Sequence, residues 1–137
     1  MSSGPGGCCG GHGETLIFTC AGAAYSGQVA NRSGVQLMEQ GAGSLFCIAA
    51  VAAGIEQKLE RARKAGRRVA VDGCEDHCVR KVLEQAHLAA DVHVVLTDMG
   101  IEKKPAQPNL ITDAKRVVEA VKQKLGIGGG APAGCCG

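Results

Sequence analysis

The amino-acid sequence predicts an α/β fold: one three-layer, flavodoxin- or Rossmann-like domain around a parallel sheet of about four strands. Short β-prone runs alternate with amphipathic helical stretches along the body of the chain. This alternation favours parallel strands joined by right-handed crossovers, with helices on both faces. Hydrophobic residues make up 45% of the chain but aromatic residues only 2%, so the core must be aliphatic, as in parallel sheets covered by helices.

The 137 residues suffice for one compact domain and not comfortably for two. We expect this domain to span residues 14–126, between flexible tails rich in glycine and cysteine at residues 1–13 and 127–137. The tails carry two adjacent cysteine pairs, Cys8 with Cys9 and Cys135 with Cys136. Such pairs on a loose backbone suit soft metal ions, so the tails form either a second metal site or terminal low-complexity sequence.

The first half of the domain predicts two strands, each followed by helical sequence. Residues 15–19 are β-prone, and a helix is expected to begin with Ser26 as its N-cap and to continue to about residue 40. Residues 44–46 are typical of a brief second strand. Residues 48–53 are rich in alanine and lead into a helix over residues 55–65, whose apolar side chains share one face.

The second half repeats the pattern. Residues 67–72 predict a third strand, which ends in Asp72-Gly73-Cys74. A helix is expected directly after it, because apolar residues follow at three-and-four spacing: Val79, Val82, Leu83 and Ala86. Residues 92–97 predict a fourth strand, and the apolar stripe within residues 112–125 predicts a last helix.

Four cysteines lie where apolar runs give way to turns: Cys20, Cys47, Cys74 and Cys78. The first three follow predicted strands, and the carboxyl ends of parallel strands meet at one edge of a sheet. Cys78 lies four residues after Cys74 at a predicted helix start, where two side chains can reach one ion. Thiolates in fours bind Zn²⁺ tetrahedrally. The sequence therefore predicts a Zn²⁺ site at this edge, with a structural, metal-handling or sensing role.

Other uses of these cysteines stay open, because their spacing is not that of a zinc ribbon. In the main alternative the chain is a thiol oxidoreductase or a metal or metalloid detoxification enzyme, in which Cys74 attacks and Cys78 resolves. Inert buried thiols are a further alternative. A phosphate-binding loop is excluded, because Gln28 stands where the lysine of that loop belongs after Gly22 and Gly27.

Two carboxylates flank the predicted site. Asp72 ends the third strand and is expected to cap the following helix or, as an alternative, to hydrogen-bond a metal ligand. Asp98 follows the fourth strand at the same edge, where it can support a ligand or face a substrate. His77 is expected to point to solvent, with metal binding as the alternative. His87 is expected on the surface, and His93 is expected to be a hydrogen-bonded strand residue.

Several motifs occur in order along the chain: Cys20-Ala21-Gly22, Gly27 to Asn31, Cys47, Val71-Asp72-Gly73-Cys74 with Cys78, and Val92 to Lys103. In these motifs the chain resembles the DGC-domain family of zinc-binding proteins, over about residues 15–104. The Asp-Gly-Cys triplet gives that family its name. The resemblance implies that Cys20, Cys47, Cys74 and Cys78 are zinc ligands, and it implies a site without a defined reaction.

The composition limits the partners. A net charge of +2 gives no strong attraction to nucleic acid, and few aromatic side chains are present to stack on bases. No run approaches the ~18 apolar residues of a membrane span, and the N-terminus lacks a signal-peptide pattern. We therefore expect a cytoplasmic protein whose partner is a metal ion, with no nucleic acid or membrane partner. Eight cysteines in that reducing compartment favour metal or redox chemistry over disulfides.

Overall fold

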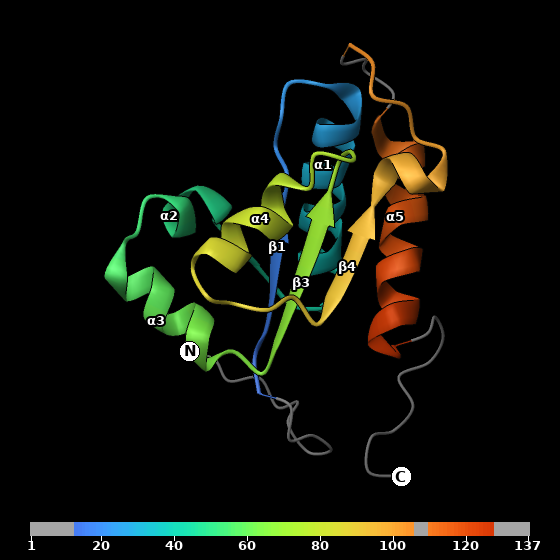
Figure 1. Cartoon of the computed structure of the whole chain (residues 1–137). Helices are drawn as coiled ribbons and strands as arrows, with labels where there is room; N and C mark the ends of the chain where they lie inside the picture. The colour runs from blue at the N-terminus through green and yellow to red at the C-terminus, as the bar shows by residue number, and fades with distance from the viewer. Residues whose placement is uncertain (1–12, 106–109, 128–137) are drawn as a thin grey trace, which may run out of the picture.

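The structure is a computed structural model that describes residues 13–105 and 110–127 and contains a four-stranded parallel sheet. The strands are β1 (Thr15–Thr19), β2 (Ser44–Phe46), β3 (Arg67–Asp72) and β4 (Val92–Val95), in the order β2-β1-β3-β4. β1 pairs in parallel with β2 and β3, and β3 pairs in parallel with β4. This order is typical of flavodoxin-like sheets, so the predicted fold class is confirmed (Figure 1).

Helices cover both faces of the sheet (Figure 1). α1 (Tyr25–Glu39) and α5 (Leu110–Leu125) pack against each other on one face, while α2 (Ile48–Ala52), α3 (Glu56–Lys64) and α4 (Cys78–Gln85) lie on the other. A short 3-10 helix, η1 (Leu96–Met99), follows β4 directly. None of the helices described has the length and the apolar character needed to cross a lipid bilayer.

The side chains of the central strands contribute to two separate cores, because successive residues of a strand point to opposite faces of the sheet. Ile17 and Val69 are buried in the core that α1 and α5 cover. Leu16, Phe18 and Ala70 are buried in the core that the other three helices cover. Both cores consist mainly of aliphatic side chains, as the composition predicts.

The end of β4 and the start of α1 differ from the prediction. β4 ends at Val95, and the residues expected to continue it form η1 instead. Gly100 adopts φ 83° there, and this left-handed conformation lets the Ile101 N–H bond back to the Leu96 carbonyl at 3.1 Å. The N-cap of α1 is Ala24 rather than Ser26, which is buried in the first turn of the helix.

The segment after η1 crosses the start of α1. The backbone N–H of Tyr25 donates to the carbonyl of Lys104 at 2.6 Å, and Ala24 forms a β-bridge with Pro105. The Tyr25 hydroxyl donates to Asp113 Oδ2 at 2.7 Å, which links α1 to α5. The hydrogen bond to Asp113, together with burial, raises the pKa of Tyr25 to about 12.

Titration of Tyr25 tests this arrangement, because Tyr25 is the only tyrosine of the chain. We expect the phenol absorbance change near 295 nm to occur around pH 12, above the pKa of about 10 of an unperturbed tyrosine. Only the protonated hydroxyl can donate to Asp113. The stabilisation is therefore present below pH ~10 and is lost as the pH rises toward the folded-state pKa. Asp113→Asn should lower the pKa of Tyr25, and an unchanged pKa in that variant would contradict the assignment.

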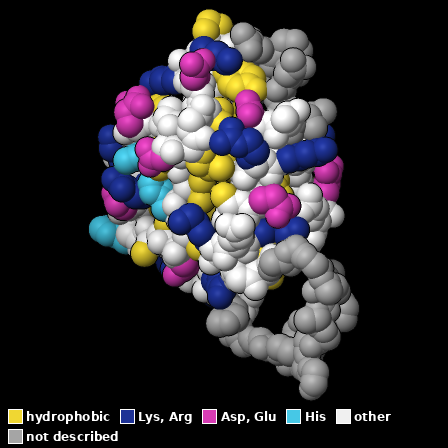
Figure 2. Space-filling view, turned by 90° about the vertical axis from the view of Figure 1, so that its right-hand side faces the viewer, with side chains coloured by type: hydrophobic (Ala, Val, Ile, Leu, Met, Phe, Trp, Pro, Cys, Tyr) yellow, Lys and Arg dark blue, Asp and Glu magenta, His cyan; other side chains and the backbone are white. Residues whose placement is uncertain are grey.

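Neither positive nor negative side chains dominate the surface over α5 and β4. Figure 2 faces this side of the molecule and shows acidic and basic side chains interspersed around a strip of apolar side chains. A mixed surface of this kind does not concentrate polyanions. The expectation that nucleic acid is not a partner stays a prediction.

Candidate metal centre

The sheet order brings the strand-following cysteines to one edge. Cys47 follows β2, Cys20 follows β1 and the Gly73-Cys74 pair follows β3. These three strands are neighbours and run parallel, so their carboxyl ends lie side by side. Cys78 is the first residue of α4, which begins near the same edge.

The local geometry around Cys74 differs from the prediction. α4 begins at Cys78, and residues 74–77 form a turn in which the His77 N–H donates to the Cys74 carbonyl at 3.1 Å. His77 adopts a left-handed conformation with φ 54°, which is costly for a residue other than glycine. The helix expected directly after Cys74 therefore begins only at Cys78, which lies in its first turn.

Two glycines, Gly27 and Gly73, let the backbone segments of this edge touch. A Cβ atom on Gly73 would lie 2.8 Å from the Gly27 nitrogen, and a Cβ atom on Gly27 would lie 2.8 Å from the Gly22 nitrogen. Such distances are shorter than real Cβ contacts. Glycine is therefore required between the loop after β1, the first turn of α1 and the loop after β3, and this close approach sets the backbones beside Cys20 and Cys74.

Cys20 is held at the end of β1 by backbone contacts. Its N–H donates to the Val71 carbonyl at 2.9 Å, and its Sγ accepts the N–H of Gly22 at 3.3 Å. The side chain of Gln28 donates to the Gly22 carbonyl at 2.7 Å and braces the same loop. A backbone N–H directed at sulfur is an interaction that a thiolate ligand of a metal accepts.

Cys74 is surrounded by charged groups that the sequence prediction missed. Its Sγ lies 3.4 Å from Asp76 Oδ2, and Lys103 Nζ donates to the same carboxylate at 2.9 Å. Lys103 Nζ also lies 3.9 Å from Glu75 Oε2. The ligand atoms of Cys74, Glu75 and Asp76 all lie within 4.8 Å of one another, so this turn is itself able to hold a cation.

These contacts shift the pKa values of Asp76 and Lys103. The hydrogen bond from Lys103, followed by that from Cys74, lowers the pKa of Asp76. The hydrogen bond to Asp76, followed by that to Cys74, raises the pKa of Lys103. Lys103 is the last residue of the motif that begins at Val92. Its positive charge is opposite to that of the acidic turn, and this complementarity is the sequence signal that could have identified it.

Cys78 shares its surroundings with two other cysteines. Its pKa is raised first by burial and then by the negative charges of Cys20, Asp72, Asp76 and Cys74.

Cys47 is not among these groups, and its exposed side chain lines a cavity of about 350 Å³ together with Asn31 and Phe46, among others. Among the residues that the structure describes, the four sulfurs do not form a set within 4.8 Å of one another.

Asp72 is almost completely buried and accepts three hydrogen bonds. The backbone N–H groups of Val79 and Arg80 donate to it at 2.7 and 3.2 Å, and His93 Nε2 lies 2.8 Å from its Oδ2. Val79 and Arg80 are in the first turn of α4, so Asp72 satisfies N–H groups at the start of the helix after β3, as expected, although the N-cap residue itself is His77.

The remaining candidates lie at varying distances from this edge. His93 is the hydrogen-bonded strand histidine that we expected, and His87 is exposed as expected. His77 is half-buried rather than turned to solvent, because its ring packs edge-to-face on His93 with centroids 5.2 Å apart. Asp98 is exposed in η1. The four tail cysteines, Cys8, Cys9, Cys135 and Cys136, lie outside the described residues, as do most of both predicted tails.

Comparisons with known proteins identify a family and a relative. The family model of the DGC domain matches residues 16–121. The anaerobic and virulence modulator AnvM of Pseudomonas aeruginosa strain PAO1 is 28% identical over 114 residues, which cover 83% of this chain and 87% of that relative. No solved structure matches the chain.

Proposed function

Because the chain belongs to the DGC domain family, we propose that it is a zinc-binding protein in which Cys20, Cys47, Cys74 and Cys78 hold one ion. The observation that carries the proposal is the set of thiols at the carboxyl ends of three adjacent strands. Four sulfur ligands are the donor set that structural Zn²⁺ prefers, and they exclude harder ions such as Mg²⁺.

The electrostatics of Cys78 support the proposal. Cys20, Cys74 and two aspartates lie close enough to Cys78 to disfavour a negative charge on it. A divalent cation among these groups reverses the effect, because it favours the ionised form of each thiol. Lys103 supplies a further positive charge beside Cys74 and Asp76, which offsets part of the charge of a four-thiolate site.

Cys47 completes the proposed ligand set from the neighbouring strand. The pairing of β1 with β2 sets Phe18 opposite Phe46, so Cys47 is level with Thr19 and one residue from the level of Cys20. Paired strands lie about 4.8 Å apart. The exposed side chain of Cys47 is free to rotate toward the other sulfurs when an ion draws them to Zn–S distances of about 2.3 Å.

The proposed role is structural, metal-handling or sensing rather than hydrolytic. Four thiolates fill a tetrahedral coordination shell and leave no position for a reactive water. AnvM bears the name of a modulator, which fits the sensing role among these three.

Cobalt titration tests the proposal, because Co²⁺ reports the ligand set through its visible absorption. We expect the full chain to bind one Co²⁺ at the described domain with a four-thiolate spectrum. Cys47→Ser and Cys78→Ser should each weaken binding about tenfold or more. A variant in which the four tail cysteines are replaced by serine is the matched control and should keep this spectrum. Equal binding by Cys47→Ser and the unaltered chain would contradict the four-ligand assignment.

A second candidate function is thiol oxidation and reduction, favoured by the proximity of Cys74 and Cys78 at the start of α4. Cys74 would attack a substrate disulfide and release one substrate thiol, and Cys78 would displace the other, which leaves a Cys74–Cys78 disulfide. Selective alkylation of Cys74 by iodoacetamide near neutral pH would favour this function, whereas equal and slow alkylation of all described cysteines would remove it.

A further inference from the structure

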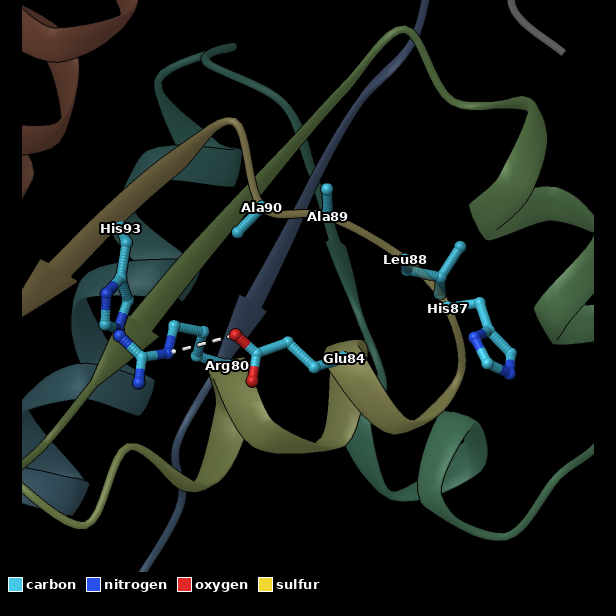
Figure 3. A pocket seen from close by; sticks show the side chains of 7 residues that line it. All are labelled: Arg80, Glu84, His87, Leu88, Ala89, Ala90 and His93. Carbon is cyan, nitrogen blue, oxygen red and sulfur yellow. Dashed lines mark ion pairs between the residues drawn. The ribbon is translucent and has the colours of Figure 1, made fainter.

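A cavity of about 390 Å³ opens between α4 and the segment that leads into β4. Its lining consists of Arg80, Glu84, His87, Leu88, Ala89, Ala90 and His93, and it includes none of the proposed metal ligands (Figure 3). A volume of this size is within the range of small-molecule sites. The cavity is therefore a candidate binding site that goes beyond the proposed zinc site.

The wall opposite α4 is held in place by Arg68. Its guanidinium Nε donates to the Ala89 carbonyl at 2.8 Å, and its Nη1 donates to the Ala62 carbonyl at 2.9 Å. Its backbone N–H donates to Asp91 Oδ2 at 2.7 Å. The Leu88 N–H bonds back to the Leu83 carbonyl at 2.8 Å as α4 ends. These bonds preform the cavity, so a ligand need not order it.

Arg80, Glu84 and His93 lie at one end of the cavity, and His87 lies at the other end beside Leu88 (Figure 3). Arg80 and Glu84 point from α4 toward the facing segment, which carries His93 (Figure 3). The Arg80 Nε atom is buried and has no hydrogen-bond partner among the described residues, although Glu84 Oε1 lies 3.4 Å away. The ion pair with Glu84 does not have hydrogen-bond geometry, so a better-placed ligand oxygen would strengthen the contact of this N–H.

His93 is oriented by a group behind it. The buried Asp72 carboxylate lies 2.8 Å from His93 Nε2 and accepts its N–H in the tautomer that this contact favours. The ring is therefore fixed, and its other nitrogen is left for solvent or a ligand. The rest of the lining consists of the apolar side chains of Leu88, Ala89 and Ala90 together with the exposed His87.

We propose that this cavity binds a small monocarboxylate with an apolar body. The ligand carboxylate pairs with the Arg80 guanidinium, which presents a planar fork that matches two carboxylate oxygens. Glu84, whose side chain is 59% exposed, turns to solvent when the ligand takes its place. The apolar body packs on Leu88, Ala89 and Ala90. One arginine matches one negative charge, and the apolar lining does not suit a phosphate dianion.

Amide chemical shifts of the ¹⁵N-labelled full chain, titrated with sodium hexanoate, test this proposal. We expect saturable shifts at Arg80, Ala89 and His93. Hexan-1-ol and inorganic phosphate should each bind at least about tenfold more weakly, because hexan-1-ol lacks the carboxylate and phosphate lacks the apolar chain. Absence of saturation with hexanoate, or equal binding of all three probes, would overturn the assignment.

Variants of the charged pair sharpen the test. R80Q should weaken hexanoate binding at least about tenfold through loss of the guanidinium. E84Q should tighten it severalfold, because the competing carboxylate is removed. K81Q is the matched control on the same helix and should leave the affinity unchanged, since Lys81 is exposed and does not line the cavity. Unchanged affinity in both R80Q and E84Q would contradict the proposed pairing.

Discussion

Asp72→Asn is expected to lower the free energy of unfolding by about 2–4 kcal/mol, the loss expected when a buried charged acceptor of several hydrogen bonds is removed. The carboxylate accepts from the backbone of Val79 and Arg80 and contacts His93 Nε2. The single side-chain oxygen of asparagine can accept only part of these hydrogen bonds. The NH₂ group of asparagine would face N–H donors, with which it cannot form a hydrogen bond. The first turn of α4 and the His93 ring therefore lose their shared partner.

Urea unfolding followed by circular dichroism measures this change. The matched control is Asp98→Asn, because Asp98 is exposed in η1 and the same substitution there should change stability by no more than about 0.5 kcal/mol. If the two variants lose equal stability, Asp72 does not organise this edge.

Gly73→Ala is expected to destabilise the fold by about 2–3 kcal/mol and to weaken metal binding about tenfold or more. The added Cβ would lie 2.8 Å from the Gly27 nitrogen and 3.0 Å from the Ser26 carbonyl carbon. Both are backbone atoms, which cannot rotate away as a side chain can. The loop after β3 must then move outward, and Cys74 moves with it, away from Cys20.

The control for Gly73→Ala is Gly22→Ala at the same edge. A Cβ atom there meets its nearest atom, Cys20 Sγ, at 3.5 Å, which is an ordinary contact. We expect this variant to lose less than about 1 kcal/mol in the same unfolding experiment. Equal destabilisation by both substitutions would show that the backbone contact at Gly73 does not limit the fold.

The strands were the most predictable part of the fold. β1, β2 and β3 match the predicted residues, because each is an apolar or β-branched run bounded by turn-forming sequence. The end of β4 was less predictable, since Leu96 continues the apolar run while Gly100 supplies the turn that makes η1. The parallel order followed from the alternation of strands and helices.

The candidate site was predictable only in part. The position of each cysteine after a strand and the cap by Asp72 follow from local patterns. The left-handed turn at His77 has no comparably specific signal, because histidine adopts positive φ more often than most residues but does so at only a few positions. The contact of Lys103 with Asp76 joins segments distant along the chain, and it depends on the path of the chain after η1.

X-ray absorption at the zinc edge tests the central claim most directly. The sample is the full chain with the four tail cysteines replaced by serine, loaded with one equivalent of Zn²⁺. We expect a shell of four sulfur atoms at about 2.3 Å from the zinc ion. A shell that contains nitrogen or oxygen ligands, or failure of this chain to retain zinc, would contradict the four-cysteine site.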